Sequence, residues 1–284
     1  MATLTSTWDL DNAVDEQRYY RSTSPIDIDN PPTPVATLLS DDRSYIDTVP
    51  AKTAHHIAVS SVKNGVEKFS EIKYIGDLNW NNVVFYSRLN GDGQDLSLIN
   101  NAPTYGSIVS YSTSVKKFGT ASLFCENDIN HRISYPAGHF GFAAGEPFTV
   151  EGWFNNTYKP TGLWQSPFGT WGASTGWCIF FTPTGLSFNY NAGGLGYNIN
   201  YLQLTWIHIA VTRDELGMMR MFVNGELKAT VFENSATIDK VLYVGGNEVT
   251  TDLWRGYIDE VRITKGVCRY KENFTPQQRQ FYDF

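Results

Sequence analysis

The sequence predicts an all-β protein made of two β-sandwiches, and three observations lead to this prediction. Short runs that alternate apolar and polar residues recur along the chain, for example at 55–62, 206–213 and 218–223, and a period of two residues is typical of strands. Helical periodicity is nearly absent. Gly, Asn, Asp or Pro bounds each run, at a spacing typical of sandwiches.

Turn signals and a change of composition place the elements. Asn64-Gly65 and Asn224-Gly225 each stand between two apolar runs and predict type I′ hairpins, because both central residues of that turn need a positive φ. The stretch 74–82 separates short strands with a Pro-rich bend from a longer part rich in Gly and aromatic residues. We therefore predict one sandwich over residues 1–77 and a second over 78–284.

Composition excludes several classes of protein. The chain has 284 residues, of which 42% are hydrophobic and 18% charged, so it can bury a core. A net charge of −7 argues against nucleic acid, which rewards a basic surface, and against anionic membranes. No stretch approaches the roughly 18 apolar residues of a membrane span. We expect neither nucleic-acid binding nor membrane insertion.

The start of the chain and its cysteines predict the compartment. Residues 1–16 have no basic start and no apolar run, so we expect no signal peptide. Cys125, Cys178 and Cys268 are an odd number in unrelated contexts, which favours buried thiols over a disulfide framework or a metal site. We expect the protein to fold in a reducing cytoplasm.

The first module contains Trp8, the pair Tyr19-Tyr20, and a Pro, Thr and alternating Val pattern that begins at Pro50. In these residues it resembles a fibronectin type III domain. His55 stands where the family usually has a tyrosine that ties a corner by hydrogen bonding to backbone, and an imidazole N–H can do the same. The resemblance implies a spacer or docking module.

Six segments of the second module follow one another in order: "VVFYSRLNGDG", "SVKKFGTASLFCENDINHRISYP", "GEPFTVEGWF", "TWIHIAVTRDELGMMRMFVNGEL", "VLYVGGN" and "WRGYIDEVRITKGVCRYKENFTP". In these segments the module resembles the laminin-G/concanavalin A-like jelly roll of bacteriophage tail and fibre proteins. The last segment is particularly phage-like. The resemblance implies a virion protein, assembled in the host bacterial cytoplasm and bound to other virion proteins. The oligomeric state stays open, because phage fibres are often homotrimers but the sequence has no heptads to drive trimer formation.

Aromatic residues on predicted loops make the second module a candidate carbohydrate binder. Five of the eight tryptophans fall between residues 153 and 206, and some stand among Gly, Pro and Ser. Rings on such loops can stack on the apolar face of a sugar while polar neighbours fix its hydroxyls; the alternative is that the rings fill the core. The candidate residues are Trp164, Trp171, Tyr158, Asn191, Tyr197 and Asn200.

Calcium and glycosidase chemistry are the two other chemistries considered. The resemblance implies that calcium ligands, if present, are Asn247, Glu248 and Asp252, although the facing loop 172–176 holds no carboxylate and no cofactor is required. Glycosidases of this fold carry a Glu-x-Asp-x-x-Glu pattern. Glu126 and Asp128 fill its first two positions, but His131 replaces the third acid. We expect a protein that is not an enzyme.

The C-terminal stretch 254–276 is predicted to close the fold rather than to carry chemistry. Ile258, Val261 and Ile263 would face inward if a bulge at Asp259-Glu260 corrects the broken alternation. The two acids are expected to be charged strand-edge residues with Arg262 or Arg255 nearby. Tyr270 and Phe274 are expected to pack back onto the sandwich, and His208 to be a half-buried, hydrogen-bonded strand residue.

Three functions remain open at this point. The first is a virion protein of the tail or its fibres whose lectin-like domain contacts host surface glycans. The second is a purely structural protein that decorates or docks the head or tail, with Trp164 and Trp171 buried. The third is a glycosidase that cleaves polysaccharide through Glu126.

Overall fold

The computed structural model describes residues 2–10, 12–50, 53–162, 164–191, 193–249 and 251–281. Every regular element in these ranges is a β-strand or a single turn of 3-10 helix, which confirms the all-β prediction. None of the helices there is long and apolar enough to cross a membrane. The chain divides into two compact units, and the break falls between Trp80 and Asn81. We call them the N-terminal unit and the C-terminal unit.

The N-terminal unit consists of two antiparallel sheets. One pairs β1 with β4, and the other has the order β3-β2-β5-β6, with β7 also paired to β5. Asn64 and Gly65 have φ values of 52° and 76° in the β5–β6 turn, which confirms the first predicted hairpin. The strands are β1 (Ala2–Thr7), β2 (Glu16–Ser22), β3 (Ala36–Leu38), β4 (Ser44–Val49), β5 (His55–Lys63), β6 (Val66–Phe69) and β7 (Lys73–Ile75).

His55 does not tie a corner in the way the sequence predicted. The imidazole is buried at the start of β5, yet neither ring nitrogen has a hydrogen-bond partner among the described residues. Burial accordingly lowers the pKa of His55, since the charged form would lose its hydration. One buried polar residue that does join segments is Gln17, whose amide donates to the carbonyls of Leu39 and Asp42 and accepts from the Trp8 indole. The fibronectin assignment stays a prediction.

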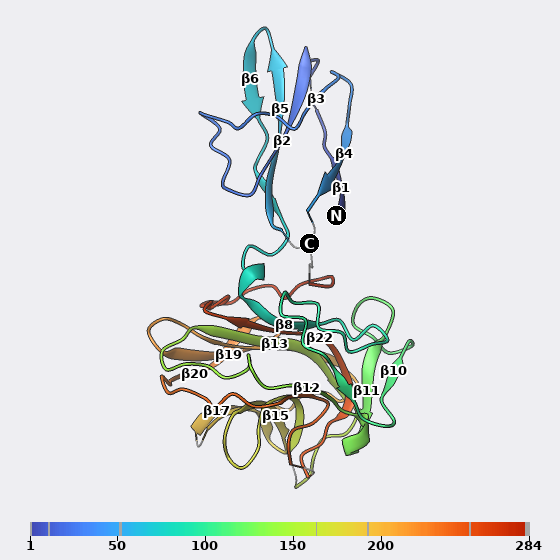
Figure 1. The fold of residues 1–284 in the computed structure, drawn as a ribbon, viewed down its shortest axis with the longest axis vertical. Helices are drawn as coiled ribbons and strands as arrows, with labels where there is room; N and C mark the ends of the chain where they lie inside the picture. Colours follow the sequence, from blue (N-terminus) through green and yellow to red (C-terminus); the bar gives the residue numbers. More distant parts are fainter. Residues whose placement is uncertain are drawn as a thin grey trace. The chain divides into compact units, whose positions relative to one another are not determined.

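The C-terminal unit is a sandwich of two antiparallel sheets (Figure 1). Within the described residues one sheet has the order β10-β11-β22-β13-β18-β19-β20, with β8 also paired to β22, and the other has the order β17-β16-β15-β14-β21-β12-β9. The elements of the first sheet are β8 (Val83–Ser87), β10 (Ser110–Ser112), β11 (Ser122–Glu126), β13 (Phe148–Asn156), β18 (Trp206–Arg213), β19 (Met218–Val223), β20 (Glu226–Phe232) and β22 (Arg255–Lys265). Those of the second are β9 (Thr104–Tyr105), β12 (Ile133–Tyr135), β14 (Gln165–Gly169), β15 (Trp177–Thr182), β16 (Gly185–Tyr190), β17 (Gly193–Asn198) and β21 (Leu242–Val244). The 3-10 helices are η1 (Trp80–Asn82) and η2 (Ile129–His131).

Alternation along the strands builds the core between these two sheets. In β18, Ile207, Ile209 and Val211 belong to one large apolar cluster together with residues of the facing sheet such as Ile179 and Phe181. The alternation predicted for residues 206–213 is therefore confirmed. The Asn224-Gly225 hairpin that follows β19 is confirmed too, with φ values of 50° and 81°.

The predicted bulge in β22 is present. Trp153 pairs with Asp259 while Glu151 pairs with Arg262, so β22 has one residue more than β13, and Glu260 takes a φ of 52°. Ile258, Val261 and Ile263 all reach the core as predicted. The position of the two acids was predicted wrongly. Asp259 and Glu260 are fully buried rather than at a strand edge, because further chain segments cover this outer face of the sheet.

The C-terminal segment 267–281 is one of the covering segments. The rings of Tyr270 and Phe274 stack with their centroids 3.6 Å apart. The Tyr270 hydroxyl donates to Glu151 Oε2 at 3.0 Å, which confirms that this segment packs back onto the sandwich. His208 is fully buried beneath it, not half-buried, and its Nε2 lies 3.4 Å from Glu151 Oε2. Burial alone would raise the pKa of Glu151, but Arg262 and His208 outweigh it and hold that pKa well below its usual range.

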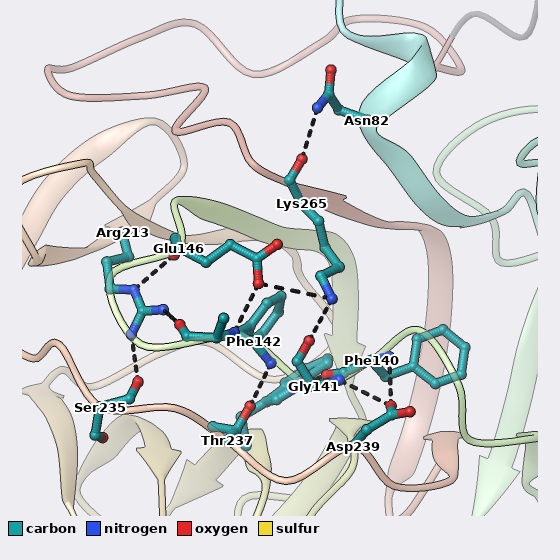
Figure 2. A network of polar contacts seen from close by, with 12 residues as sticks. Asn82, Phe140, Gly141, Phe142, Glu146, Arg213, Ser235, Thr237, Asp239 and Lys265 are labelled. Carbon is teal, nitrogen blue, oxygen red and sulfur yellow. Dashed lines mark hydrogen bonds and ion pairs between the residues drawn. The ribbon is translucent and has the colours of Figure 1, made fainter.

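The Arg213 side chain holds together the loops at one end of the sandwich (Figure 2). It is fully buried at the end of β18, and its guanidinium donates to the carbonyls of Glu146, Ser235 and Ala143 and to the Tyr190 hydroxyl. The same loops meet again where Phe140 and Gly141 donate to Asp239, and Phe142 to Thr237.

The cysteines are free thiols. Cys125 and Cys178 are buried as predicted, and Cys268 is half-buried. Burial raises the pKa of each of the three thiols, so they are packing groups rather than nucleophiles.

Candidate functional site

Loops at one end of the C-terminal unit surround a pocket of about 360 Å³. Its volume lies within the range of about 300–1,000 Å³ that is usual for ligand sites. The β13–β14 loop contributes most of the wall, the start of β22 contributes Arg255, and the residue after β11 contributes Asn127. The lining residues are Asn127, Tyr158, Pro160, Thr161, Gly162, Trp164, Gln165, Thr251 and Arg255.

Buried amides fix the shape of the β13–β14 loop. Asn156, the last residue of β13, accepts from the Tyr158 N–H at 2.9 Å and donates to Gln165 Oε1 at 2.6 Å. Both amide side chains are almost fully buried, so the two ends of the loop are joined out of reach of water. The Thr157 N–H donates to the Arg255 carbonyl at 3.1 Å and ties the loop to β22. Such a loop presents its side chains from a fixed frame.

Gly256 allows β22 to begin beside β13. It has a φ of 145°, and a Cβ at this position would lie 2.2 Å from the Asn155 carbonyl oxygen. Only glycine tolerates both the angle and the contact. Asn127 follows β11, which also pairs with the start of β22. It takes a φ of 60°, which asparagine adopts more readily than most residues, and its N–H donates to the Trp254 carbonyl. The residues on either side of Arg255 therefore hold this wall in place.

Two aromatic rings and one cation give the pocket its chemical character. Tyr158 is 41% exposed and Trp164 is 39% exposed. The Arg255 guanidinium lies over the Tyr158 ring, 5.3 Å from its centroid. Trp164 meets Phe180 edge-on at 5.3 Å, and Phe180 points away from the core because its neighbours Ile179 and Phe181 point into it. Exposed rings beside a hydrogen-bond donor can hold a ligand that has both an apolar face and polar groups.

The structure brings some of the predicted carbohydrate residues together and not others. Tyr158 and Trp164 line the pocket. Asn200 accepts from Lys159 at 2.7 Å, which places it against the same loop. Trp171 is half-buried and meets the same Phe180 ring edge-on, with the ring centroids 6.0 Å apart.

Asn191 and Tyr197 do not belong to the pocket lining. Asn191 takes a φ of 50° in the turn after β16, and its amide donates to the Ala236 carbonyl. Tyr197, on β17, packs against the core cluster, with the Lys228 ammonium 5.7 Å from its ring. These two predicted carbohydrate residues are thus engaged in structural contacts.

Two of the three residues predicted as calcium ligands already contact protein cations. The Glu248 carboxylate pairs with the Lys240 ammonium at 2.6 Å, and the Arg132 guanidinium donates to the Asn247 carbonyl. Burial raises the pKa of Asp252, which disfavours its charged form. Protein cations therefore contact the Glu248 carboxylate and the Asn247 carbonyl, two of the oxygens that a hard metal ion would need. In the part of the chain that the structure describes, no group of three or more His, Cys, Asp or Glu residues could hold a metal ion.

Glu126 and Asp128 do not share one strand face. The left-handed residue Asn127 stands between them, and Asp128 caps η2 by accepting from the Asn130 N–H at 2.8 Å. A retaining glycosidase needs two facing carboxyl groups, one as acid and one as nucleophile. The arrangement leaves Glu126 at the end of β11 and exposed.

Sequence reasoning missed Arg255, Asn127, Gln165 and Thr251 as pocket residues. Arg255 comes directly before a glycine at the start of a predicted strand, which is the only signal in the sequence that could have pointed to a strand-end side chain. Asn127 and Thr251 come from two separate loops and Gln165 from the start of β14, and only the fold brings them together.

Two stacked antiparallel sheets with a ring-lined pocket on their loops define a β-sandwich of the lectin type. The chain belongs to the concanavalin A-like lectin/glucanases superfamily, because a laminin G family model of that superfamily matches residues 127–272. No curated protein matches the chain.

Solved structures similar to the chain include binding domains of clostridial toxins. The botulinum neurotoxin serotype G binding domain has a TM-score of 0.53 at 15% identity, with 68% of this chain and 49% of that chain covered. The serotype D ligand-binding domain in complex with N-acetylneuraminic acid has a TM-score of 0.53 at 15% identity, with 70% of this chain and 50% of that chain covered. The binding domain of Paraclostridial Mosquitocidal Protein 1 has a TM-score of 0.51 at 14% identity, with 69% of this chain and 50% of that chain covered. The chain thus spans about half the length of these domains, and the similarity shows a shared fold.

Proposed function

We propose that the C-terminal unit binds a carbohydrate on a host-cell surface, through the pocket lined by Tyr158, Trp164 and Arg255. The observation that carries the proposal is the pair of exposed rings on a braced loop of a lectin-type sandwich. Rings held in this way lose little conformational freedom when a sugar stacks on them. The neighbouring amide and hydroxyl groups of Asn127, Thr161 and Thr251 can bond its hydroxyls.

A glycan array and a pull-down with host cells, both with the full chain, test this function. Wild type is expected to bind a defined set of glycans, and Trp164→Ala is expected to lose them while keeping its melting temperature, because the ring is well exposed. Leu216→Ala, which changes a side chain 78% exposed in the β18–β19 turn, is the matched control. Wild type that binds no host glycan would refute the proposal.

We also propose that the chain is a component of a bacteriophage particle, in the tail or its fibres. The support is the ordered set of motifs and the phage-like closing segment 254–276. In this role the N-terminal unit would be a fibronectin-like spacer that docks on other virion proteins, and a homotrimer would present several pockets at once. Cross-linking mass spectrometry of intact particles would identify the neighbours, and absence of the chain from purified particles would refute this role.

The second candidate is a purely structural protein without glycan binding. The observation that favours it is Trp171, which is half-buried against Phe180 and whose carbonyl accepts from the Glu248 N–H. Acrylamide quenching separates the two functions. Strong quenching that is lost in Trp164→Ala supports an accessible site, and fluorescence insensitive to acrylamide supports the structural role.

A further inference from the structure

We propose that the pocket selects acidic sugars, with the Arg255 guanidinium as the group that recognises the anion. The inference rests on the proposed carbohydrate function and adds the chemical class of the ligand. Arg255 is the one cation among the described lining residues, and no carboxylate is among them. An anionic group that enters the pocket therefore meets one positive charge and no lining acid.

The side chain of Arg255 differs from those of other arginines of the C-terminal unit because it has no acceptor of its own. Arg220 pairs with Asp214 at 2.7 Å, and Arg262 pairs with Glu151 at 2.7 Å. The Arg255 side chain makes no hydrogen bond or ion pair within the described ranges. Its strand neighbour across the sheet is Glu126, yet the two side chains form no ion pair, and both are exposed. The guanidinium donors face solvent until a ligand arrives.

The Tyr158 ring orients this free guanidinium. A guanidinium 5.3 Å from a ring centroid is attracted to the ring, which restricts its rotamers. The donors of arginine form a planar fork that fits both oxygens of a carboxylate or two oxygens of a sulfate. A neutral hydroxyl offers a single acceptor without charge. Orientation before binding reduces the entropy lost on binding. The resulting gain in affinity is larger for an anion than for a hydroxyl, because the anion accepts from two donors of the fork and the hydroxyl from one.

The net charge of the whole chain does not favour acidic sugars, so the selectivity depends on the pocket alone. The net charge of −7 repels anions in general, so preference for an acidic sugar has to come from contacts in the pocket. Lys159, next to Tyr158 on the same loop, adds positive charge at the rim while its ammonium bonds Asn200. Close contacts are screened less by salt than distant ones, so the preference should persist at physiological ionic strength.

The test compares matched glycans on the full chain. One arm uses oligogalacturonate and the same oligosaccharide with its carboxyl groups reduced to alcohols, and the other uses a sulfated galactan oligosaccharide and its desulfated parent. Wild type is expected to bind the acidic member at least about ten-fold more tightly, the size of a charge-assisted hydrogen bond. Whichever arm shows the larger ratio identifies the anion as carboxylate or sulfate.

Two variants separate this inference from the proposed function. Arg255→Gln should lower the affinity for the acidic glycan to the affinity for its neutral parent. The affinity for the neutral parent itself should not change. Arg43→Gln removes the same charge from an exposed side chain of the N-terminal unit and should change neither. Equal affinity of wild type for acidic and neutral members, or no effect of Arg255→Gln, overturns the inference but leaves carbohydrate binding standing. Absence of binding to every glycan overturns both.

Discussion

Replacing Arg213 by methionine should destabilise the C-terminal unit strongly, although Arg213 is far from the pocket in the sequence and touches none of its lining residues. The methionine has a similar length and no charge, so it removes the donors without opening a large cavity. Arg213 is fully buried and makes four hydrogen bonds that join the loop 140–147 to Ser235 and Tyr190 (Figure 2).

The expected loss follows from what each acceptor retains. The Ser235 carbonyl still accepts from the Tyr190 hydroxyl, and the Ala143 carbonyl still accepts from the Glu146 N–H. The Glu146 carbonyl loses its Arg213 donor and costs about 1–3 kcal/mol when left unsatisfied. The other three bonds contribute about 0.5–1 kcal/mol each. Relief from burying a charge offsets part of this sum, so we expect a loss of about 3 kcal/mol.

Urea unfolding followed by tryptophan fluorescence measures this loss in the full chain. Lys265→Met is the matched control, because Lys265 belongs to the same network but is a quarter exposed and donates to a single carbonyl, that of Gly141. It should cost about 1 kcal/mol. If Arg213→Met lies within about 1 kcal/mol of wild type, the loops do not depend on this arginine and the reasoning is refuted.

Three further predictions concern the covered face of the sheet and the predicted calcium site. Burial raises the pKa of Asp259 to about 8 and that of Glu260 to about 7, so between pH 4 and 8 the folded state holds protons that the unfolded state has lost. The free energy of unfolding should therefore fall as pH rises, by up to about 1.4 kcal/mol per pH unit per group. Asp259→Asn should flatten this dependence of the free energy of unfolding on pH. Equal slopes in wild type and Asp259→Asn would contradict the raised pKa of Asp259. Phe274→Ala removes a half-buried ring that is stacked on Tyr270, and urea titration should show a loss of about 2 kcal/mol; a neutral result would mean that the segment 267–281 is not anchored by this ring. Adding millimolar calcium or a chelator should leave the melting temperature unchanged, because Lys240 already pairs with Glu248, whereas a rise with calcium concentration would reveal a site that stabilises the folded state.

Local patterns predicted the strands and turns well, because the information needed lies within a few residues. Ile207, Ile209 and Val211 alternate with polar neighbours, and the Asn224-Gly225 pair requires the φ values that its turn provides. The burial of Asp259 and Glu260 could not be found in this way. It depends on the N–H groups of Lys117, Phe118 and Phe281, which come from segments that cover the sheet from outside.

The candidate site divides along the same line. Tyr158 and Trp164 could be predicted from the sequence, because aromatic residues among Gly and Pro indicate exposed loops. The position of Arg255 could not, since it depends on the β22 strand starting next to the β13–β14 loop, about a hundred residues earlier in the chain. A periodic pattern reports which face of a strand a residue occupies. It does not report which distant loop lies beyond the end of that strand.

The place of β22 in the sheet has a consequence for synthesis. β22 is the last strand of the C-terminal unit among the described residues, yet it pairs with β8, β11 and β13, which precede it by about 100 residues or more. Until residue 265 has left the ribosome, those three strands expose edges that no other described strand fills. A nascent chain in this state is prone to aggregate and would benefit from a chaperone. Release of a chain cut short before β22 should therefore yield insoluble protein rather than a smaller sandwich.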